Sequence, residues 1–478
     1  MYVVDRGGIE PPTLGPERVL PRARRAFVPL NYRPTISCTR QSMFKRSQRT
    51  AAPRPSPGPE PFLKRLKRRG SKMPGFDLDD RLFWLAKEKE IKEGRTTDEY
   101  FVHTKDVLRR NQIDSKVVME VYARDVPYPQ NWGVVSGIYE AAKLLEGLPV
   151  DVWAFDEGSV FLADSSTALY EPIMVIEGRY SDFAEYETPL LGLLASSTSV
   201  STRAAMFRMA AGRKLLFSFG TRRVHPALAA MVERACYLAG FDGVSNVLGA
   251  KLLKITPSGT MPHALIQILG DQERAWKLFD ETVAKDVPRI ALVDTFWDEK
   301  AESIKAFEVL GPKLWGVRLD TPASRRGDFR KIIEEVRWEL DIRGGEKVKL
   351  IASGRLDEEN VRQLRELVDG FGVGTAVAYP PVIDLSAKIV EAIDRGHREF
   401  RAKRGGLGGR KAVFRSKGFR DAVILAGSPK PKKSSALLTP LLKGGKLARK
   451  YEGIDRIRSR LAADLSRLEA SQPSLAWR

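Results

Sequence analysis

The sequence has few cysteines and no long apolar run. Only two of its 478 residues are cysteine, Cys38 and Cys236, which excludes a disulfide framework and a four-cysteine zinc site. No run of 18 apolar residues occurs, so no segment is expected to span a membrane. The chain is nevertheless 43% apolar and 29% charged, a composition typical of folded domains. We therefore expect a soluble, cytoplasmic protein of two or three domains, without zinc and without membrane contact.

The positive charge is concentrated at the two ends of the chain. Residues 1–72 carry 17 basic and 4 acidic residues, and residues 401–478 carry 20 and 5. The middle of the chain holds the remaining 43 basic and 51 acidic residues and is acidic, although the whole chain has a net charge of +20. A nucleic-acid-binding domain carries its positive charge on a folded face. Nucleic acid is therefore not an expected partner, and a basic tail that binds RNA is kept as an alternative.

Residues 1–72 do not have the pattern of a folded domain. They are rich in proline and show no sustained hydrophobic period. The string Gly7-Gly8-Ile9-Glu10-Pro11-Pro12-Thr13 resembles a transfer-RNA gene read as a reading frame. We expect residues 1–72 to be a disordered, mis-assigned extension and Met73 to be the true first residue.

Apolar runs and amphipathic stretches alternate from residue 117 onward. We expect strands over 117–124 and 150–155, a helix over 132–145 between them, and a long helix over 189–212. Five more strands are then expected, over residues 214–220, 289–296, 314–320, 348–354 and 370–377. The helices expected between them cover residues 226–239, 300–310, 329–340 and 358–368. Repeated strand–helix units predict parallel strands with right-handed crossovers, and hence an α/β sheet or barrel.

Polar residues collect where these runs end. They are Thr221, Arg222, Arg223, Asp294, Thr295, Arg318, Asp320, Ser353 and Gly354. The carboxyl ends of barrel strands form the active-site rim. Arginine side chains and the N–H groups of a glycine-rich backbone bind phosphate oxygens. Paired aspartates can hold Mg²⁺ against a diphosphate. A flat aromatic side chain can stack on an electron-rich ring. The set predicts transfer of a ribosyl phosphate from a diphosphate donor.

Six motifs together resemble the nicotinate phosphoribosyltransferase family. They are Thr97-Asp98-Glu99-Tyr100-Phe101, Phe219-Gly220-Thr221-Arg222-Arg223, Gly240-Phe241-Asp242-Gly243-Val244-Ser245-Asn246-Val247, Gly259-Thr260-Met261-Pro262-His263, Gly316-Val317-Arg318-Leu319-Asp320 and Phe371-Gly372-Val373-Gly374-Thr375. The resemblance implies an irregular β/α barrel of the type II phosphoribosyltransferase kind beside an α/β sandwich N-terminal domain, assembled as a homodimer or a larger homo-oligomer. We accordingly expect a sandwich domain over residues 73–195 joined by 396–450, a barrel over 196–395, and a charged tail over 451–478.

The resemblance also implies which residues hold the substrate. Tyr100 and Phe219 would sandwich the pyridine ring, Tyr100 from across a dimer interface, although both could be core aromatics. Arg222 would meet the nicotinate carboxylate or the donor phosphates. Ser245 and Asn246 would bind the ring substituent. Relatives that use nicotinamide have an aspartate at the position of Ser245, and a serine hydroxyl can instead donate to a carboxylate.

The catalytic and phosphate-binding groups follow from the same resemblance. Arg318 would meet the reacting ribose or diphosphate, with a surface ion pair as the alternative. Asp294 and Asp320 would hold ribose hydroxyls or Mg²⁺, although Asp294 could simply cap a helix. The phosphate-binding residues implied are Ser353, Gly354, Gly372, Gly374 and Thr375.

His263 occupies the position at which the family carries a histidine that ATP phosphorylates. A phosphorylated imidazole would couple ATP hydrolysis to product formation, whereas a lone histidine is more often structural. The expected reaction joins nicotinate and phosphoribosyl pyrophosphate, with ATP as co-substrate and Mg²⁺ as cofactor. The alternatives are a quinolinate or nicotinamide phosphoribosyltransferase, or an inactive relative with an altered 321–328 loop.

Overall fold

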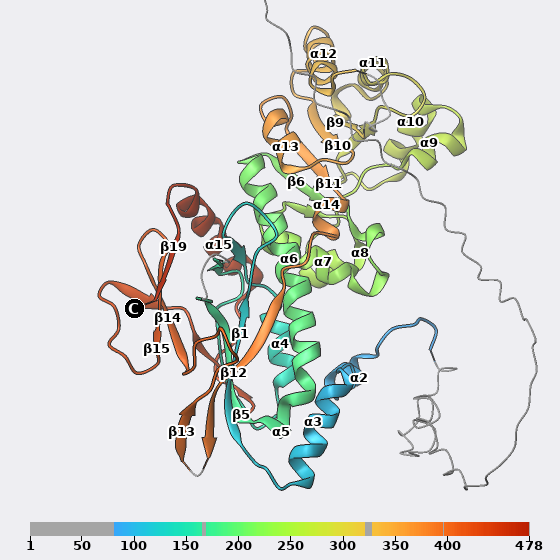
Figure 1. Ribbon diagram of the computed structural model, residues 1–478. Coiled ribbons are helices and arrows are strands. Elements are labelled where there is room, and N and C mark those ends of the chain that lie inside the picture. The colour runs from blue at the N-terminus through green and yellow to red at the C-terminus, as the bar shows by residue number, and fades with distance from the viewer. Residues whose placement is uncertain (1–80, 165–168, 321–326, 395, 478) are drawn as a thin grey trace, which may run out of the picture. The chain divides into compact units, whose positions relative to one another are not determined.

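The structure is a computed structural model that describes residues 81–164, 169–320, 327–394 and 396–477 (Figure 1). The expectations for residues 1–72 and for a start at Met73 lie outside the described residues, as does most of the 321–328 loop. The described chain from Leu82 onward forms one compact unit. Among the described helices, none combines the length and apolar character that a bilayer crossing requires.

The first sheet is antiparallel and has the strand order β13-β12-β1-β5-β3-β17-β18. Its strands are β1 (Lys116–Ala123), β3 (Asp151–Ala154), β5 (Pro172–Arg179), β12 (Leu385–Asp394), β13 (His397–Phe400), β17 (Thr439–Lys443) and β18 (Lys446–Leu447). Helices α2 (Glu88–Lys92) and α3 (Glu99–Arg110) precede it, and short helix α5 (Tyr180–Phe183) follows β5. Four of the seven strands come from the last hundred residues, so the end of the chain completes a sheet that its beginning starts.

The long helix α6 (Glu187–Ala211) contributes to both hydrophobic cores. Leu190 and Leu194 pack in the core of the first sheet, whereas Phe207 and Ala211 pack in the core of the parallel strands. Small residues are buried all around this helix, as expected for a helix enclosed on every side.

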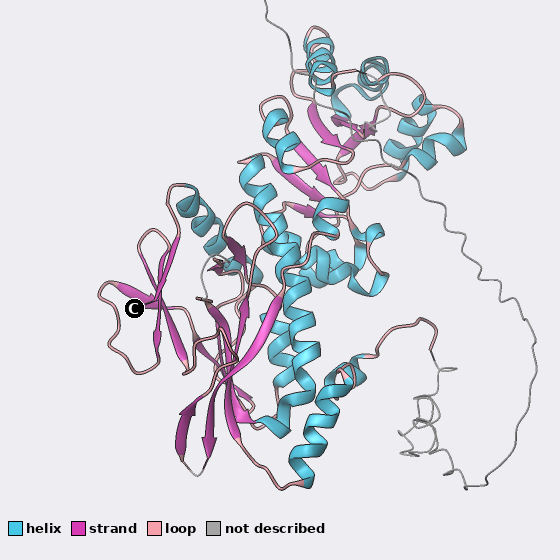
Figure 2. Ribbon diagram, viewed as in Figure 1, coloured by secondary structure: helices cyan, strands magenta, loops and turns pink. Residues whose placement is uncertain are grey.

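The second sheet is wholly parallel, with the strand order β7-β6-β11-β10-β9-β8. Its strands are β6 (Leu215–Ser218), β7 (Gly243–Val244), β8 (Arg289–Leu292), β9 (Leu314–Leu319), β10 (Lys349–Ser353) and β11 (Gly370–Val373). Helices α7 (Ala229–Leu238), α8 (Val247–Leu253), α9 (His263–Leu269), α10 (Gln272–Thr282), α11 (Glu299–Leu310), α12 (Phe329–Asp341), α13 (Glu358–Leu364) and α14 (Thr375–Ala378) connect or follow them (Figure 2). The predicted strand–helix alternation is confirmed, and β7 and β8 are the edges of an incomplete barrel.

The helix predicted over 132–145 is partly wrong. Residues Trp132–Val134 form strand β2, which pairs with β4 (Val160–Leu162), and helix α4 covers only Ile138–Leu145. The strand is favoured because the Thr202 hydroxyl of α6 accepts the buried N–H of Val134 at 2.9 Å. Gly137, with φ of 91°, then turns the chain into the helix.

The C-terminal segment forms a further sheet and a helix. The sheet has the order β16-β14-β15-β19, with strands β14 (Lys411–Ser416), β15 (Arg420–Leu425), β16 (Ser434–Ala436) and β19 (Ser474–Trp477). Helix α15 (Ile454–Glu469) buries Ile457 and Leu461 in the same core as the parallel strands. The charged stretch expected as a tail is therefore packed against the folded protein.

Candidate active site at the carboxyl ends of the parallel strands

The parallel sheet brings the predicted polar residues to one edge. Because all six strands run in the same direction, residues that directly follow them lie at a common rim. The rim carries Phe219, Ser245, Asp294, Asp320, Ser353 and Gly374.

His263 lies at the start of α9 and faces two carboxylates. Its Nδ1 is 3.1 Å from the Thr295 hydroxyl, while its Nε2 is 3.9 Å from Asp294 Oδ1 and 3.8 Å from Asp320 Oδ2. The Asp320 carboxylate, and then that of Asp294, raise the pKa of His263 above its usual value. The imidazole side chain is 36% exposed and is therefore accessible to a ligand.

Asp294 is a buried carboxyl without a hydrogen-bond donor. Its side chain is 4% exposed, and neither side-chain oxygen has a hydrogen-bond partner in the described chain. Burial raises the pKa of Asp294 to about 6. The alternative that Asp294 caps a helix is excluded, because Asp298 accepts the first N–H groups of α11.

Asp320 is held in its charged form by its neighbours. Ser353 Oγ donates to Asp320 Oδ1 at 3.0 Å, and Arg318 Nη2 donates to Oδ2 at 3.3 Å. The side chain of His263, with Arg318 and Ser353, lowers the pKa of Asp320 to about 2. Ser353, predicted to bind phosphate, thus orients Asp320 in the structure.

Arg318 is a buried guanidinium rather than a surface arginine. Its side chain is 12% exposed, its Nη1 donates to Thr260 Oγ1 at 2.8 Å, and its Nε has no partner in the described chain. Burial lowers the pKa of Arg318, and the positive charge of Arg222 adds to this effect. Arg222 is exposed and makes no ion pair among the described residues. Two neighbouring guanidinium groups favour a polyanionic ligand.

Phe219 forms the aromatic wall of the rim. Its ring lies parallel to Phe217 at 6.2 Å, and the Arg318 guanidinium lies 5.6 Å from its centroid. A Cβ atom at Gly372 would come within 2.2 Å of the Phe219 ring. Gly372 is therefore required to seat the aromatic ring, whatever its part in phosphate binding.

Ser245 and Asn246 follow β7 beside Phe219. The Ser245 N–H donates to the carbonyl of Ser218, the residue before Phe219. The Asn246 side-chain oxygen accepts from Gly249 N at 2.9 Å and caps α8, so its amide NH₂ is the group left for a ligand. Both side chains are only half-buried.

The remaining predicted phosphate-binding residues lie in the loops after the strands. Gly354 has a φ of 98°, in the region that favours glycine, where β10 ends. Gly374 and the exposed Thr375 lie where β11 passes into α14. Their placement at the rim fits a phosphate but does not test it.

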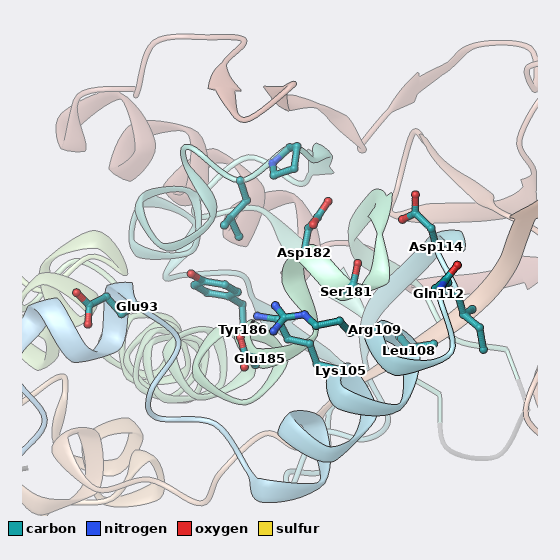
Figure 3. A pocket seen from close by; sticks show the side chains of 13 residues that line it. Glu93, Lys105, Leu108, Arg109, Gln112, Asp114, Ser181, Asp182, Glu185 and Tyr186 are labelled. Atoms are coloured by element: carbon teal, nitrogen blue, oxygen red, sulfur yellow. Dashed lines mark hydrogen bonds and ion pairs between the residues drawn. The ribbon is translucent and has the colours of Figure 1, made fainter. Parts of the chain in front are cut away.

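Tyr100 does not join the barrel residues within this chain. It lies in α3, is 60% exposed, and its ring contacts Phe101 at 4.3 Å. With Phe101, Val117, Met119 and Ile389 it lines a surface groove of about 630 Å³ beside β1 and β12. A larger hollow, shown in Figure 3, lies between α3 and α5 and contains none of the predicted site residues.

Four residues to which the sequence interpretation gave no role shape the site. Thr260, which is part of a quoted motif, contacts Arg318, and Thr295, which follows Asp294, contacts His263. Glu233 of α7 and Glu302 of α11 are fully buried. Acidic residues in amphipathic helices usually face solvent, so no local signal could have identified these two.

Glu302 fixes the loop that carries Asp294 and Thr295. Its carboxylate accepts the N–H groups of Thr295, Phe296 and Trp297 at 3.1, 2.8 and 2.9 Å. These bonds fix the backbone directly after Asp294, and therefore orient a carboxylate that has no donor of its own.

The two aspartates fit a magnesium ion. Asp294 offers two buried oxygens without hydrogen-bond partners in the described chain, with His263 Nε2 at 3.9 Å, which is an environment that a hard cation could satisfy. Among the described residues, no group of three or more His, Cys, Asp or Glu side chains is arranged for a metal. The rest of the coordination shell would therefore come from water and substrate phosphates, as is usual for Mg²⁺.

Two protein-family models match the chain. The quinolinate phosphoribosyl transferase C-terminal domain matches residues 200–388, and the N-terminal domain of the same family matches residues 98–198. The two matches together cover more than half of the chain.

Curated relatives and solved structures agree with these matches. Nicotinate phosphoribosyltransferase of Bacillus subtilis is 28% identical over 309 residues, 58% of this chain, and the match spans 62% of that protein, less than two thirds. A nicotinate phosphoribosyltransferase of Mycobacterium tuberculosis is 27% identical over 67% of this chain and 78% of its own.

Two solved structures show the same fold. The nicotinate-nucleotide pyrophosphorylase of Pyrococcus furiosus is 46% identical with a TM-score of 0.78, covering 81% of this chain and 99% of that one. Human nicotinic acid phosphoribosyltransferase is 19% identical with a TM-score of 0.63, covering 80% and 97%. The second likeness concerns the fold alone. The predicted fold class, an irregular β/α barrel beside an N-terminal α/β domain, is confirmed.

Proposed function

This chain belongs to the quinolinate phosphoribosyltransferase family, and from that premise we propose that it joins nicotinate to phosphoribosyl pyrophosphate in NAD biosynthesis, giving nicotinate mononucleotide and pyrophosphate. The names of its curated relatives support nicotinate as the acceptor. The observation that carries the proposal is the buried Arg318. Its guanidinium group lies over the Phe219 ring, pairs with Asp320 and is close enough to the exposed Arg222 to feel its charge. This arrangement offers a stacking surface and two guanidinium groups for a diphosphate.

The chemistry requires positioning more than proton transfer. The pyridine nitrogen attacks C1 of the ribose while pyrophosphate leaves, and the nitrogen is nucleophilic without a general base. Phe219 would orient the ring, and Arg318 and Arg222 would stabilise the charge that develops on the leaving group. Asp294 and Asp320 would hold Mg²⁺, which supplies further electrostatic stabilisation of the diphosphate. The reaction therefore requires neither a nucleophilic hydroxyl nor a general base at the rim.

Quinolinate is a less favourable substrate than nicotinate. It carries a second carboxylate, which requires additional positive charge near the ring. The group behind Ser245 and Asn246 is instead the buried carboxyl of Glu233. The structure near the ring therefore supports the acceptor with one carboxylate.

Nine of the described basic residues after residue 400 make ion pairs within the protein. Lys411 pairs with Glu120, Arg415 with Asp421, and Lys443 with Asp151. A basic side chain that is paired with a carboxylate inside the protein is not available to neutralise an RNA phosphate. These ion pairs therefore argue against RNA binding by this region. Weak or salt-independent RNA retention is the expected result of a filter-binding experiment.

The test of the function is turnover of nicotinate, nicotinamide and quinolinate side by side, with phosphoribosyl pyrophosphate, with and without ATP. We expect nicotinate mononucleotide from nicotinate as the main product. Release of carbon dioxide from quinolinate at a higher rate would establish the quinolinate enzyme instead. Absence of product from all three acceptors would identify an inactive relative.

Replacement of Ser245 by aspartate should impair nicotinate use selectively. A second carboxylate next to the substrate carboxylate repels it, so we expect the KM for nicotinate to rise by about tenfold or more. The melting temperature should fall far less than the affinity for nicotinate, because Ser245 is half-buried, although the new carboxylate also faces the buried Glu233. Steady-state kinetics and thermal unfolding measure the two effects, with Ser428→Asp in an exposed turn as the control. An unchanged KM would remove Ser245 from the ring pocket.

We also propose that the enzyme is a cytoplasmic homodimer in which Tyr100 completes the partner's site. The exposed ring of Tyr100 beside an apolar groove supports this, because no contact within the described chain joins it to the barrel rim. A mixture of inactive Tyr100→Ala and inactive Arg318→Ala proteins should then recover activity. Random reassociation gives hybrid dimers with one intact site, or about a quarter of wild-type activity. Each variant refolded alone is the control, and no recovery in the mixture would place Tyr100 outside the partner's site.

A further inference from the structure

Glu233 is a fully buried carboxyl group directly behind the ring-binding loop. It lies on α7, and its Oε1 accepts the N–H of Asn246 at 3.0 Å and is 3.4 Å from the hydroxyl of Ser245. Its Oε2 is buried and has no hydrogen-bond partner in the described chain. The carboxyl is therefore coupled to the loop through one oxygen, and the other is free to carry a proton.

Tight packing holds this carboxyl in place. A Cβ atom at Gly249 would lie 2.9 Å from Glu233 Cβ, so only glycine lets α8 approach so closely. Burial raises the pKa of Glu233, and the Ser218 and Ser245 hydroxyls and the Asn246 N–H oppose this effect. Ser218 comes from β6, and Ser245 and Asn246 come from the loop between β7 and α8. On α7 itself, the titratable neighbour is the buried Cys236 thiol. No cation among the described residues compensates a charge on Glu233.

The protonation state of this carboxyl decides what Ser245 offers to a ligand. A serine hydroxyl has one hydrogen and two acceptor lone pairs. An ionised Glu233 is an acceptor only, so it takes that hydrogen and leaves Ser245 to present lone pairs, which suit an amide NH₂. A neutral Glu233 carries its proton on the unpartnered Oε2, and its Oε1 is then a weaker acceptor than a carboxylate oxygen, so the Ser245 hydroxyl can donate to a ligand carboxylate instead.

We infer that Glu233 is a specificity-determining residue that acts through Ser245, and that its neutral form selects a ring acid over the ring amide. The inference rests on the proposed function, since it assumes that the ring substituent meets Ser245. Glu233 is a positioning residue, because it touches Ser245 and Asn246 and not the substrate.

The test is the ratio of the dissociation constants of nicotinamide and nicotinate, measured by competitive displacement between about pH 5 and pH 9. His263 can also change the ratio with pH, because its charge acts on the ligand carboxylate and not on the amide. That contribution is present in every variant, so the comparison with Glu233→Gln isolates the part that belongs to Glu233. For the wild type we expect the preference for nicotinate to be greatest at low pH. It should fall by about tenfold or more as the pH rises through the raised pKa of Glu233, because the new charge repels the ligand carboxylate.

Two variants and one matched control make the test specific. In Glu233→Gln the side chain is permanently neutral, so the part of the pH dependence that belongs to Glu233 should be lost. Ser245→Ala, which leaves Glu233 unchanged, should lower the ratio at low pH and weaken its pH dependence. Glu302→Gln alters the other buried glutamate that fixes a rim loop, and it should retain the wild-type pH dependence of the ratio.

The outcomes separate this inference from the proposed function. Failure of the wild type to use nicotinate would overturn the function. Turnover of nicotinate with a ratio that does not vary with pH, or with the same variation in Glu233→Gln, would overturn the role of Glu233 alone. If Glu233→Gln does not fold, as judged by thermal unfolding, the comparison of wild type with Ser245→Ala decides the question.

Discussion

Replacement of Arg318 by lysine should lower kcat/KM for phosphoribosyl pyrophosphate by about 10²-fold while the protein remains folded. Lysine retains the positive charge but loses the planar fork that binds two oxygens at once. In the structure this fork already bonds Thr260 and Asp320, and it lies over Phe219. A lysine ammonium cannot keep these contacts and also grip a diphosphate.

The measurement is steady-state kinetics together with circular dichroism and thermal unfolding. Arg330→Lys is the matched control, because Arg330 makes an exposed pair with Glu334 on α12, and such pairs contribute little. Wild-type kinetics in Arg318→Lys would show that the arginine is only part of the packing at the rim.

Replacement of His263 by alanine should abolish ATP hydrolysis and the gain in rate and yield that ATP provides. We propose that His263 accepts a phosphoryl group, since the unmodified ring adds no negative charge beside the diphosphate site whereas phosphoimidazole does. The reaction without ATP should therefore largely survive. The position of the imidazole, half-exposed and 3.8 to 3.9 Å from two carboxylates, supports this role.

Two other roles for His263 predict different results. If His263 were a general acid or base, its replacement would lower the reaction rate by about 10²–10⁴-fold both with and without ATP. A purely structural histidine would lower the melting temperature and reduce both activities equally. The assay is nicotinate mononucleotide formation and phosphate release, measured together on wild type, His263→Ala and the exposed control His103→Ala. ATP hydrolysis that still accompanies product formation in His263→Ala would contradict the coupling role.

The strand–helix alternation after residue 212 was predictable because it is a local property. Hydrophobic period and turn residues set each element, and parallel strands place their carboxyl ends together without further information. Asp294, Asp320 and Arg318 could therefore be grouped from the strand pattern, whereas His263 was predicted from the family resemblance of its motif; the structure brings all four to one rim. Their roles in catalysis remain predictions. The fold class is confirmed by the solved structures as well.

Elements that depend on distant contacts were not predictable in the same way. Residues 132–134 form a strand because the Thr202 hydroxyl of α6 accepts the N–H of Val134, and the Thr198 hydroxyl accepts the N–H of Ser136 just after the strand. The charged stretch after residue 450 has a composition typical of a tail, yet α15 packs on the barrel core. The composition of a segment describes that segment alone, whereas the position of each of these elements depends on contacts with residues far away in the sequence.

The sequence by itself determined the order of the barrel elements and the chemistry at their ends, because both follow from local hydrophobic patterns and from motifs. Only the tertiary structure decided which polar groups lose contact with water. Asp294 is left without a donor, and Glu233 and Glu302 are buried behind the rim loops. Burial of a carboxyl depends on which helices pack over it, and that packing, through desolvation, sets the protonation states on which the proposed selectivity depends.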